Sequence, residues 1–437
     1  GHEILDLQLR GEYLYAARGR GGFYAYDVAN IDNQGFSERI VTAPVSPRGQ
    51  RLGFDTTYAV AVASPATVAV DPARSRFSSD PTKPRATIMD PAQPWHVNQE
   101  QAVHPMYAYL YVGDREEGLV LTNAATLLDG DPTNNFMTRA TLDDGSTAFN
   151  PGGLLKGLTH LVVAGHYLYV TCERGLVVID IDKPLAPKVV ATVSAGLSLP
   201  KAVAVQFRYA FVTDAFGLKV VDITDPTAPR FVEGAQVLLQ DAHRVYVART
   251  YAFVAAGRQG LAIVDVTNPE KPTLQQLFDA DGKMTDARDV KVGMTNASLY
   301  GYVADGAGGL KVLELMGPNT TPQFRGFAPP LAPRLIAHYH THGPALTLSK
   351  GLDRDRAVDE TGHQVAVFGR IGARPLNLKE MQQLYLRNGK PWTVTDTPSV
   401  PAQPFTYKAP GEDKPTPPRR PGGPRRPGPP RRSGPPK

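Results

Sequence analysis

Three histidines alternate with other residues at one place in the chain, and their side chains are well suited to binding a metal. The stretch is His338-Tyr-His-Thr-His342. On a β-strand, alternate side chains share a face, so neighbouring histidines would lie about 6.6 Å apart. Two of these imidazoles could share a metal ion, or one could be an axial ligand of haem iron. A polar strand face with hydrogen-bonded histidines is the alternative, and the sequence leaves both open.

Two other residue types recur at fixed places in an apolar pattern. An acid that precedes Thr-Asn-Pro or Thr-Asp-Pro can accept turn N–H groups, so we expect the recurring aspartates to act in folding rather than catalysis. The sequence therefore offers no catalytic residue. The repeated aspartates are Asp27, Asp180, Asp222 and Asp265, and the repeated glycines that open a strand are Gly118, Gly175, Gly217, Gly260 and Gly309.

The element that must position these residues is a hairpin, best seen in residues 250–272. Its first run, Tyr251 to Ala255, is aromatic and β-branched, as expected for a strand. A turn with glycines follows, then a second run, Leu261 to Val266. Pro269 and Pro272 end the second run because proline cannot extend a sheet ladder. An additional strand precedes each hairpin and a weaker one follows it, which makes four strands per unit.

Copies of this unit repeat along the chain. The glycine before the second strand stands at 175, 217, 260 and 309, a period of 42 to 49 residues. A β-rich repeat of this length is typical of propeller blades, which bury their faces by stacking around an axis. We therefore predict an all-β fold, a β-propeller of about seven four-stranded blades with a disordered or extended C-terminal tail.

The second strand of the unit resembles a named repeat. Residues 261–266 read Leu-Ala-Ile-Val-Asp-Val, 176–181 read Leu-Val-Val-Ile-Asp-Ile, and 218–223 read Leu-Lys-Val-Val-Asp-Ile. These phrases resemble the LVIVD repeat, and the likeness extends over about residues 3–316. The resemblance implies a propeller of bacterial or archaeal exported or surface proteins. It also implies an association with multihaem c-type cytochromes, and it supplies no shared catalytic residues.

The predicted organisation has three parts. Residues 1–370 form the propeller, with insertions at 32–58, 72–105 and 123–153 and a divergent last blade at 335–368. Residues 371–397 form a short helical or irregular extension, with a helix expected at 377–387 because Leu378, Met381 and Leu384 give an apolar stripe. Residues 398–437 form a tail rich in Pro, Arg and Gly that cannot build a core.

The charge of the chain is concentrated in this tail. The whole chain has a formal net charge of +5, but residues 411–437 alone carry +6, which leaves about −1 for the rest. Nucleic-acid binding by the propeller is therefore not expected. The tail holds three Arg-Arg pairs that could bind an acidic partner, haem propionates or an anionic surface, or could belong to a simple spacer. Nucleic-acid binding by the tail is a third, less favoured alternative, because the aromatic residues needed for base stacking are not interleaved. The pairs are Arg419, Arg420, Arg425, Arg426, Arg431 and Arg432.

Cysteine usage limits the cofactor chemistry. The single cysteine, Cys172, allows no internal disulfide, and no Cys-x-x-Cys-His occurs, so we expect no covalently attached c-type haem. No apolar run approaches the ~20 residues of a membrane helix. The absence of a signal peptide says little about the compartment, because the sequence opens at Gly1 rather than Met.

These observations favour a non-enzymatic scaffold or docking module of an exported, periplasmic or surface assembly. By resemblance, its protein partner would be a multihaem cytochrome, or else further copies of the chain. Two alternatives remain: a metal- or haem-dependent enzyme with its site at the propeller mouth or on the 338–342 strand, and a surface adhesion or carbohydrate-binding propeller.

Overall fold

The computed structural model describes residues 2–10, 13–27, 52–65, 105–124, 127, 137–294, 298–318, 320–321 and 330–350, and four two-residue strands between 370 and 391. β-Strands dominate this part, with two short 3-10 helices, η4 (Pro105–Ala108) and η6 (Pro151–Gly153). Within the described residues no helix is long and apolar enough to span a membrane.

Six antiparallel sheets, here called blades 1 to 6, follow one another along the chain. Blade 1 contains β1 (Asp6–Arg10), β2 (Tyr13–Ala17), β3 (Phe23–Asp27) and β4 (Gly53–Phe54). Blade 2 contains β5 (Ala59–Ala63), β6 (Tyr109–Asp114) and β7 (Gly118–Asn123). Blade 3 contains β8 (His160–Ala164), β9 (Tyr167–Cys172), β10 (Gly175–Asp180) and β11 (Lys188–Val193).

The remaining three blades have the same four-strand order. Blade 4 contains β12 (Ala202–Gln206), β13 (Tyr209–Asp214), β14 (Gly217–Asp222) and β15 (Arg230–Leu238). Blade 5 contains β16 (Val245–Ala248), β17 (Tyr251–Ala255), β18 (Leu261–Asp265) and β19 (Thr273–Phe278). Blade 6 contains β20 (Asp289–Met294), β21 (Leu299–Ala304), β22 (Leu310–Met316) and β23 (Arg334–Tyr339).

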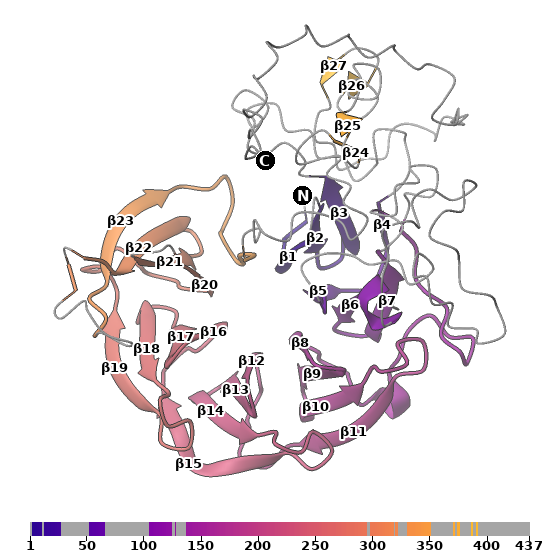
Figure 1. Cartoon of the computed structure of the whole chain (residues 1–437), viewed down its shortest axis with the longest axis horizontal. Helices are drawn as coiled ribbons and strands as arrows, with labels where there is room; N and C mark the ends of the chain where they lie inside the picture. The colour runs from indigo at the N-terminus through magenta and orange to yellow at the C-terminus, as the bar shows by residue number, and fades with distance from the viewer. Residues whose placement is uncertain are drawn as a thin grey trace, which may run out of the picture. The chain divides into compact units, whose positions relative to one another are not determined.

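The blades are arranged around a central axis, with the first strand of each blade innermost (Figure 1). Along the chain from blade 1 to blade 6, the innermost strands of successive blades contact one another. The predicted β-propeller is confirmed, but the count of about seven is wrong, since six blades are found in the described part of the chain. The strand expected to open a divergent last blade at 335–368 is β23, the outermost strand of blade 6. The proline-rich connection before β23 made it look like a new unit.

An aromatic pair in the second strand explains how successive blades pack. Each hairpin begins Tyr-x-Tyr or Tyr-x-Phe. In blades 1 to 5 the second aromatic is at most 2% exposed and belongs to an apolar cluster shared with the following blade. Phe211 of blade 4, for example, shares a cluster with Ala252 and Val254 of blade 5. Since each sheet has two apolar faces, this arrangement removes both from water.

Polar contacts join blade 6 to blade 1 through residues 345–350, here called the closing segment. Gly306 of blade 6 forms a bridge with Ala345, and the Leu348 N–H donates to Asp289 Oδ2 at 2.8 Å. On the other side, the Leu9 N–H of β1 donates to Ser349 Oγ at 2.7 Å. In Figure 1 the closing segment runs inward beside β1. Among the described residues, the closing segment therefore links blade 6 to blade 1.

The C-terminal part of the chain gives fewer structural facts. The chain divides into two compact units, residues 1–403 and 404–437, and the second lies outside the described residues. Most of the predicted helix at 377–387 is also outside them. Its last two residues are not helical but form β26 (Leu386–Arg387), which pairs with β27 (Lys390–Pro391). The other short pair is β24 (Arg370–Ile371) with β25 (Arg374–Pro375).

The glycine that precedes the third strand is required by close backbone packing. Gly260 has φ +74°, and a Cβ on it would overlap the carbonyl oxygen of Phe278 in the outermost strand. Gly282 has a matching φ of +76° but open space where its Cβ would point. Alanine substitutions at these two glycines can therefore separate the effect of backbone conformation on stability from the effect of crowding.

We expect Gly260→Ala to lower the free energy of unfolding more than Gly282→Ala. The control should lose about 1 kcal/mol because an L-residue is placed at positive φ. Gly260→Ala should lose about 1–3 kcal/mol more because β19 must move. Urea unfolding of both variants checks this, and equal losses would show that crowding by the outermost strand does not matter.

A charged pair fixes the connection into blade 2. Glu117 accepts hydrogen bonds from the Thr57 N–H at 2.7 Å and from Arg139 Nη2 at 2.9 Å. The Arg139 hydrogen bond is the main cause that lowers the pKa of Glu117 to about 2. Because the folded-state pKa lies below the ordinary value, this stabilisation is present above about pH 4.5 and is lost as the pH falls towards 2.

We expect Glu117→Gln to lower the free energy of unfolding by about 1 kcal/mol at pH 7, and the difference from wild type to vanish near pH 2. The neighbouring exposed Glu116 supplies the matched control, Glu116→Gln. Chemical unfolding at several pH values measures both. A Glu117→Gln deficit that stays constant down to pH 2 would contradict the assigned role of the ion pair.

Candidate functional site

The three predicted metal-binding histidines lie at the outer edge of blade 6. His338 is in β23, and His340 and His342 follow it, all three exposed. The rings of His338 and His340 are 5.4 Å apart and nearly perpendicular. Among the described residues, no group of three or more His, Cys, Asp or Glu side chains is placed to hold a metal ion. Metal or haem ligation at these histidines stays a prediction.

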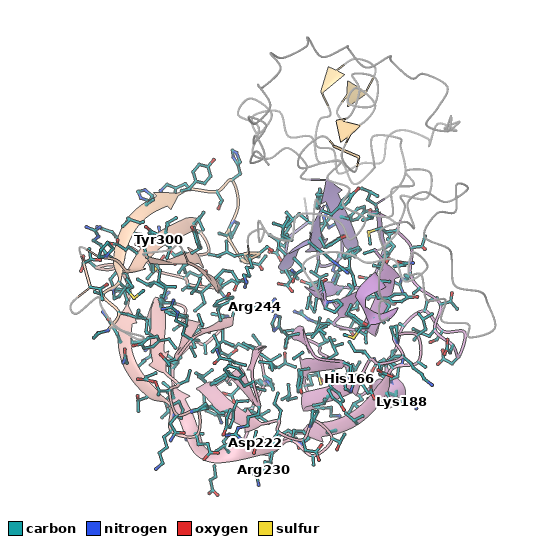
Figure 2. The ribbon with its side chains drawn as sticks, in the orientation of Figure 1. His166, Lys188, Asp222, Arg230, Arg244 and Tyr300 are labelled. Atoms are coloured by element: carbon teal, nitrogen blue, oxygen red, sulfur yellow. The ribbon has the colours of Figure 1, made fainter. Side chains whose placement is uncertain are left out.

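The repeated aspartates lie at the ends of the third strands. Asp180, Asp222 and Asp265 each accept the N–H of the residue two positions later, at 2.7–2.9 Å. Asp222 also pairs with Arg230 at 2.9 Å, and Figure 2 shows both residues at the rim of blade 4, away from the axis. Asp27 ends β3. The aspartates with described side chains thus hold the turn that leads to the outermost strand.

The repeated glycines and the cysteine also lie within the blades. Each of the five glycines has positive φ, and a Cβ on it would crowd a backbone carbonyl oxygen; they are Gly118, Gly175, Gly217, Gly260 and Gly309. Cys172 is buried, and its thiol donates to the Leu154 carbonyl oxygen at 3.5 Å. Burial raises the pKa of this thiol, which disfavours the reactive thiolate. The six tail arginines lie outside the described residues.

The structure reveals a buried charged cluster near the axis that the sequence interpretation missed. It joins Asp6 of blade 1, Arg244 before β16, and Asp289 and Lys291 of β20, with Thr347 of the closing segment between the two acids. Arg244 Nη2 lies 3.5 Å from Asp6 Oδ1 and 3.3 Å from the Leu5 carbonyl oxygen. Figure 2 shows Arg244 at the centre of the ring. The cluster therefore spans blades 1, 5 and 6.

The two buried acids of this cluster both contact Thr347 but otherwise have different partners. Asp289 is fully buried and lies 2.7 Å from Lys291 Nζ, and its second oxygen accepts from Thr347 Oγ1 at 3.1 Å. Asp6 accepts the Val62 N–H of blade 2 at 2.9 Å. Burial raises the pKa of Asp6, although Arg244 opposes this effect.

A second charged group lies beside the first, on the segments that enter β12, β16 and β20. Asp241 lies 3.0 Å from both Lys201 Nζ and His243 Nε2. Arg288 Nε lies 2.7 Å from Asp286 Oδ1, and Arg288 Nη1 is 3.3 Å from His243 Nε2. Burial lowers the pKa of His243 below its ordinary value, so its neutral form is favoured near pH 7.

Some of these contacts join charges of different blades and others lie within one blade. Arg244 with Asp6 and Lys201 with Asp241 join two blades, whereas Lys291 with Asp289 and Arg288 with Asp286 lie within blade 6. A nucleophile with an adjacent base would need a hydroxyl, thiol or amine left free for substrate. The arrangement instead resembles an ion-pair network. A sequence signal existed, since Lys201, Arg244 and Arg288 each stand directly before an innermost strand.

Comparisons with known proteins agree with the repeat inferred from the sequence. The family model of the LVIVD repeat matches residues 159–194, 201–236 and 240–280. These ranges coincide with blades 3, 4 and 5. No curated protein sequence matches the chain significantly.

Solved structures with a similar fold are distant. Apo AztD from Citrobacter koseri is 12% identical, with 79% of this chain and 89% of that chain covered and a TM-score of 0.40. The β-propeller domain of Cps50 (Swd1) from Myceliophteria thermophila is 12% identical, with 77% and 87% covered and a TM-score of 0.41. BamB from Moraxella catarrhalis is 12% identical, with 70% and 68% covered and a TM-score of 0.35.

The repeat family and the blade architecture thus agree on the central part of the molecule. The chain is a β-propeller with three consecutive LVIVD repeats, which form blades 3 to 5.

Proposed function

We propose that this chain is a non-enzymatic propeller that serves as a scaffold or docking module in an exported or cell-surface assembly. The observation that carries the proposal is the run of three LVIVD repeats within a ring of six blades. The charges near the axis support it, because two of their ion pairs, Arg244 with Asp6 and Lys201 with Asp241, join different blades and so stabilise the ring. A rigid ring of this kind presents loops and sheet edges at fixed positions, which suits protein recognition.

The partner that we propose is a multihaem c-type cytochrome. This rests on the resemblance to LVIVD-repeat proteins, some of which are found with such cytochromes. The Arg-Arg pairs of the tail would add attraction to haem propionates or to an acidic surface of the partner. A partner of this kind would be met outside the cytoplasm, where c-type cytochromes reside, so the proposal includes an exported location.

Purification of the tagged full-length chain from its native source tests this proposal. We expect a stoichiometric partner with the absorbance spectrum of c-type haem, identified by mass spectrometry, and its absence from a mock purification of untagged cells. A variant with the six tail arginines replaced by Gln should retain less partner at moderate ionic strength. A preparation free of any haem protein would contradict the proposed partner.

A second candidate role is metal or haem-iron ligation at the outer edge of blade 6. The observation that favours it is the 5.4 Å separation of the His338 and His340 rings on an exposed strand end. Borderline metals such as Zn²⁺ accept imidazole ligands, and an exposed pair leaves positions open for a partner's ligands.

Calorimetric titration of the full-length chain with Zn²⁺ checks this role. We expect a binding isotherm for the wild type and its loss when His338, His340 and His342 are all replaced by Ala. His166, which stacks on Tyr167 in blade 3, supplies a control variant, His166→Ala. Equal heats for the triple variant and the wild type would exclude these histidines as the site.

A further inference from the structure

The face of blade 6 that is directed away from blade 5 differs from the same face of every other blade. The second aromatic of the hairpin is buried in blades 1 to 5, with exposed fractions of 0–2%. In blade 6 the equivalent residue is Tyr302, and it is 38% exposed. Tyr300, which begins this aromatic pair, is labelled on blade 6 in Figure 2.

The neighbours of Tyr302 on this face are also less covered than their counterparts. Tyr302 pairs with Val312, which in turn pairs with Ala337 of β23. Val312 is half-buried and Ala337 is exposed, whereas Ile263, the counterpart of Val312 in blade 5, is 1% exposed. A row of apolar side chains thus crosses blade 6 without the cover that the other blades receive.

The closing segment occupies the place of the first strand of a further blade. Its bridge between Gly306 and Ala345 repeats the bridges Gly257–Ala287 and Gly19–Ala59. Ala287 stands just before the innermost strand β20, and Ala59 is the first residue of the innermost strand β5.

The side-chain contacts between innermost strands give the same alignment. Asp289 accepts the Leu348 N–H of the closing segment. In the same way Asp6 accepts the Val62 N–H of the next blade, and His160 Nδ1 accepts the Val203 N–H.

The outer edge of the closing segment has no sheet partner in the described part of the chain. Every innermost strand of blades 1 to 6 pairs with the second strand of its own blade. For the closing segment, the pairing found among described residues is the bridge at Ala345. An unpaired strand edge next to an uncovered apolar face is the arrangement that accepts an added β-strand.

We propose that the uncovered face of blade 6 and the outer edge of the closing segment form a docking slot for one extended strand of a partner protein. The proposal rests on the proposed docking function and gives it a surface. The side chains that would fit the slot can be inferred from blade 4. Its equivalent face is covered by Ala252 and Val254, which are alternate residues of β17 in blade 5. The partner strand therefore carries small or branched apolar side chains at alternate positions.

Charge around the slot defines the ends of the partner strand. Lys291, Lys311 and Arg334 of blade 6 are already paired with Asp289, Asp305 and Glu314, respectively. The exposed imidazoles of β23 and the residues after it remain as donors at the rim, from His338, His340 and His342. Acidic residues flanking the apolar strand would match these donors.

A peptide copied from the chain's own second strand provides the probe. The fluorescently labelled peptide Tyr-Ala-Phe-Val-Thr-Asp, the sequence of residues 209–214, is titrated with the full-length protein and followed by anisotropy. We expect saturable binding, weakened about tenfold or more by Tyr302→Asp, because an unpaired carboxylate would then face the apolar strand. Phe207→Asp, which changes an aromatic residue that is 93% exposed on blade 4, should leave the affinity unchanged.

Hydrogen exchange separates the possible occupants of the slot. Addition of the peptide should slow amide exchange in residues 345–350 and leave blades 3 and 4 unaffected.

The proposal is overturned if the peptide does not bind, or if Tyr302→Asp binds it as the wild type does. It is also overturned if residues 351–369 of the free protein already exchange slowly and peptide binding is absent, since the chain itself would then fill the slot. A native partner that still binds the Tyr302→Asp variant would leave the docking function intact and refute only the slot.

Discussion

One packing contact determines the architecture: the second aromatic of each hairpin lies against the next blade. A four-stranded sheet with apolar residues on both faces is not stable in water alone, because one face always remains exposed. In this chain Phe253 of blade 5 shares a cluster with Val303 and Leu313 of blade 6, and the same relation recurs back to blade 1. Repetition of the contact explains both the sequence period and the ring.

Packing of each blade on the next does not by itself explain how the first and last blades of the row are joined. In the described residues, blade 6 and blade 1 are joined by polar contacts through the closing segment. Thr347 lies between Asp6 and Asp289, and Ser349 accepts the Leu9 N–H. Hydrogen bonds of this kind depend on direction and distance, so they fix the position of the closing segment closely. They do not bury a sheet face, which is why Tyr302 stays exposed while its five counterparts are covered.

The charged cluster near the axis also helps to join blade 6 to the closing segment. Asp289 is fully buried, and a buried carboxylate is destabilising unless it is paired and hydrogen-bonded. Lys291 and the Leu348 N–H meet that requirement from two different parts of the chain. The cluster therefore couples blade 6 to the closing segment.

The features of the fold that depend on local sequence pattern were predicted correctly. The Tyr-x-aromatic pair, the strand-opening glycines such as Gly217 and the turn aspartates such as Asp222 all recur in register, and alternation with turn residues is enough to recognise a hairpin. The family likeness followed from the same residues and agrees with the three matched repeats.

What the sequence could not show depends on contacts between distant residues. β23 follows its partner β22 after a connection much longer than in blades 3 to 5, so its pattern was read as a separate blade. Asp6 and Thr347 are separated by 341 positions and approach only because the ring closes. The exposure of Tyr302 is invisible in a sequence where its motif matches that of its buried counterparts.

These contacts indicate where on the described blades a partner could bind most easily. The axial charges of the propeller are paired internally, so a ligand there would have to break contacts that hold the ring. The apolar row of Tyr302, Val312 and Ala337 requires no such loss, since covering it removes apolar surface from water. The His338 strand end borders the same blade edge, which would bring its imidazoles near the ends of any added strand. Recognition at this edge would therefore use the packing that builds the blades, with the histidines selecting among strands of similar shape.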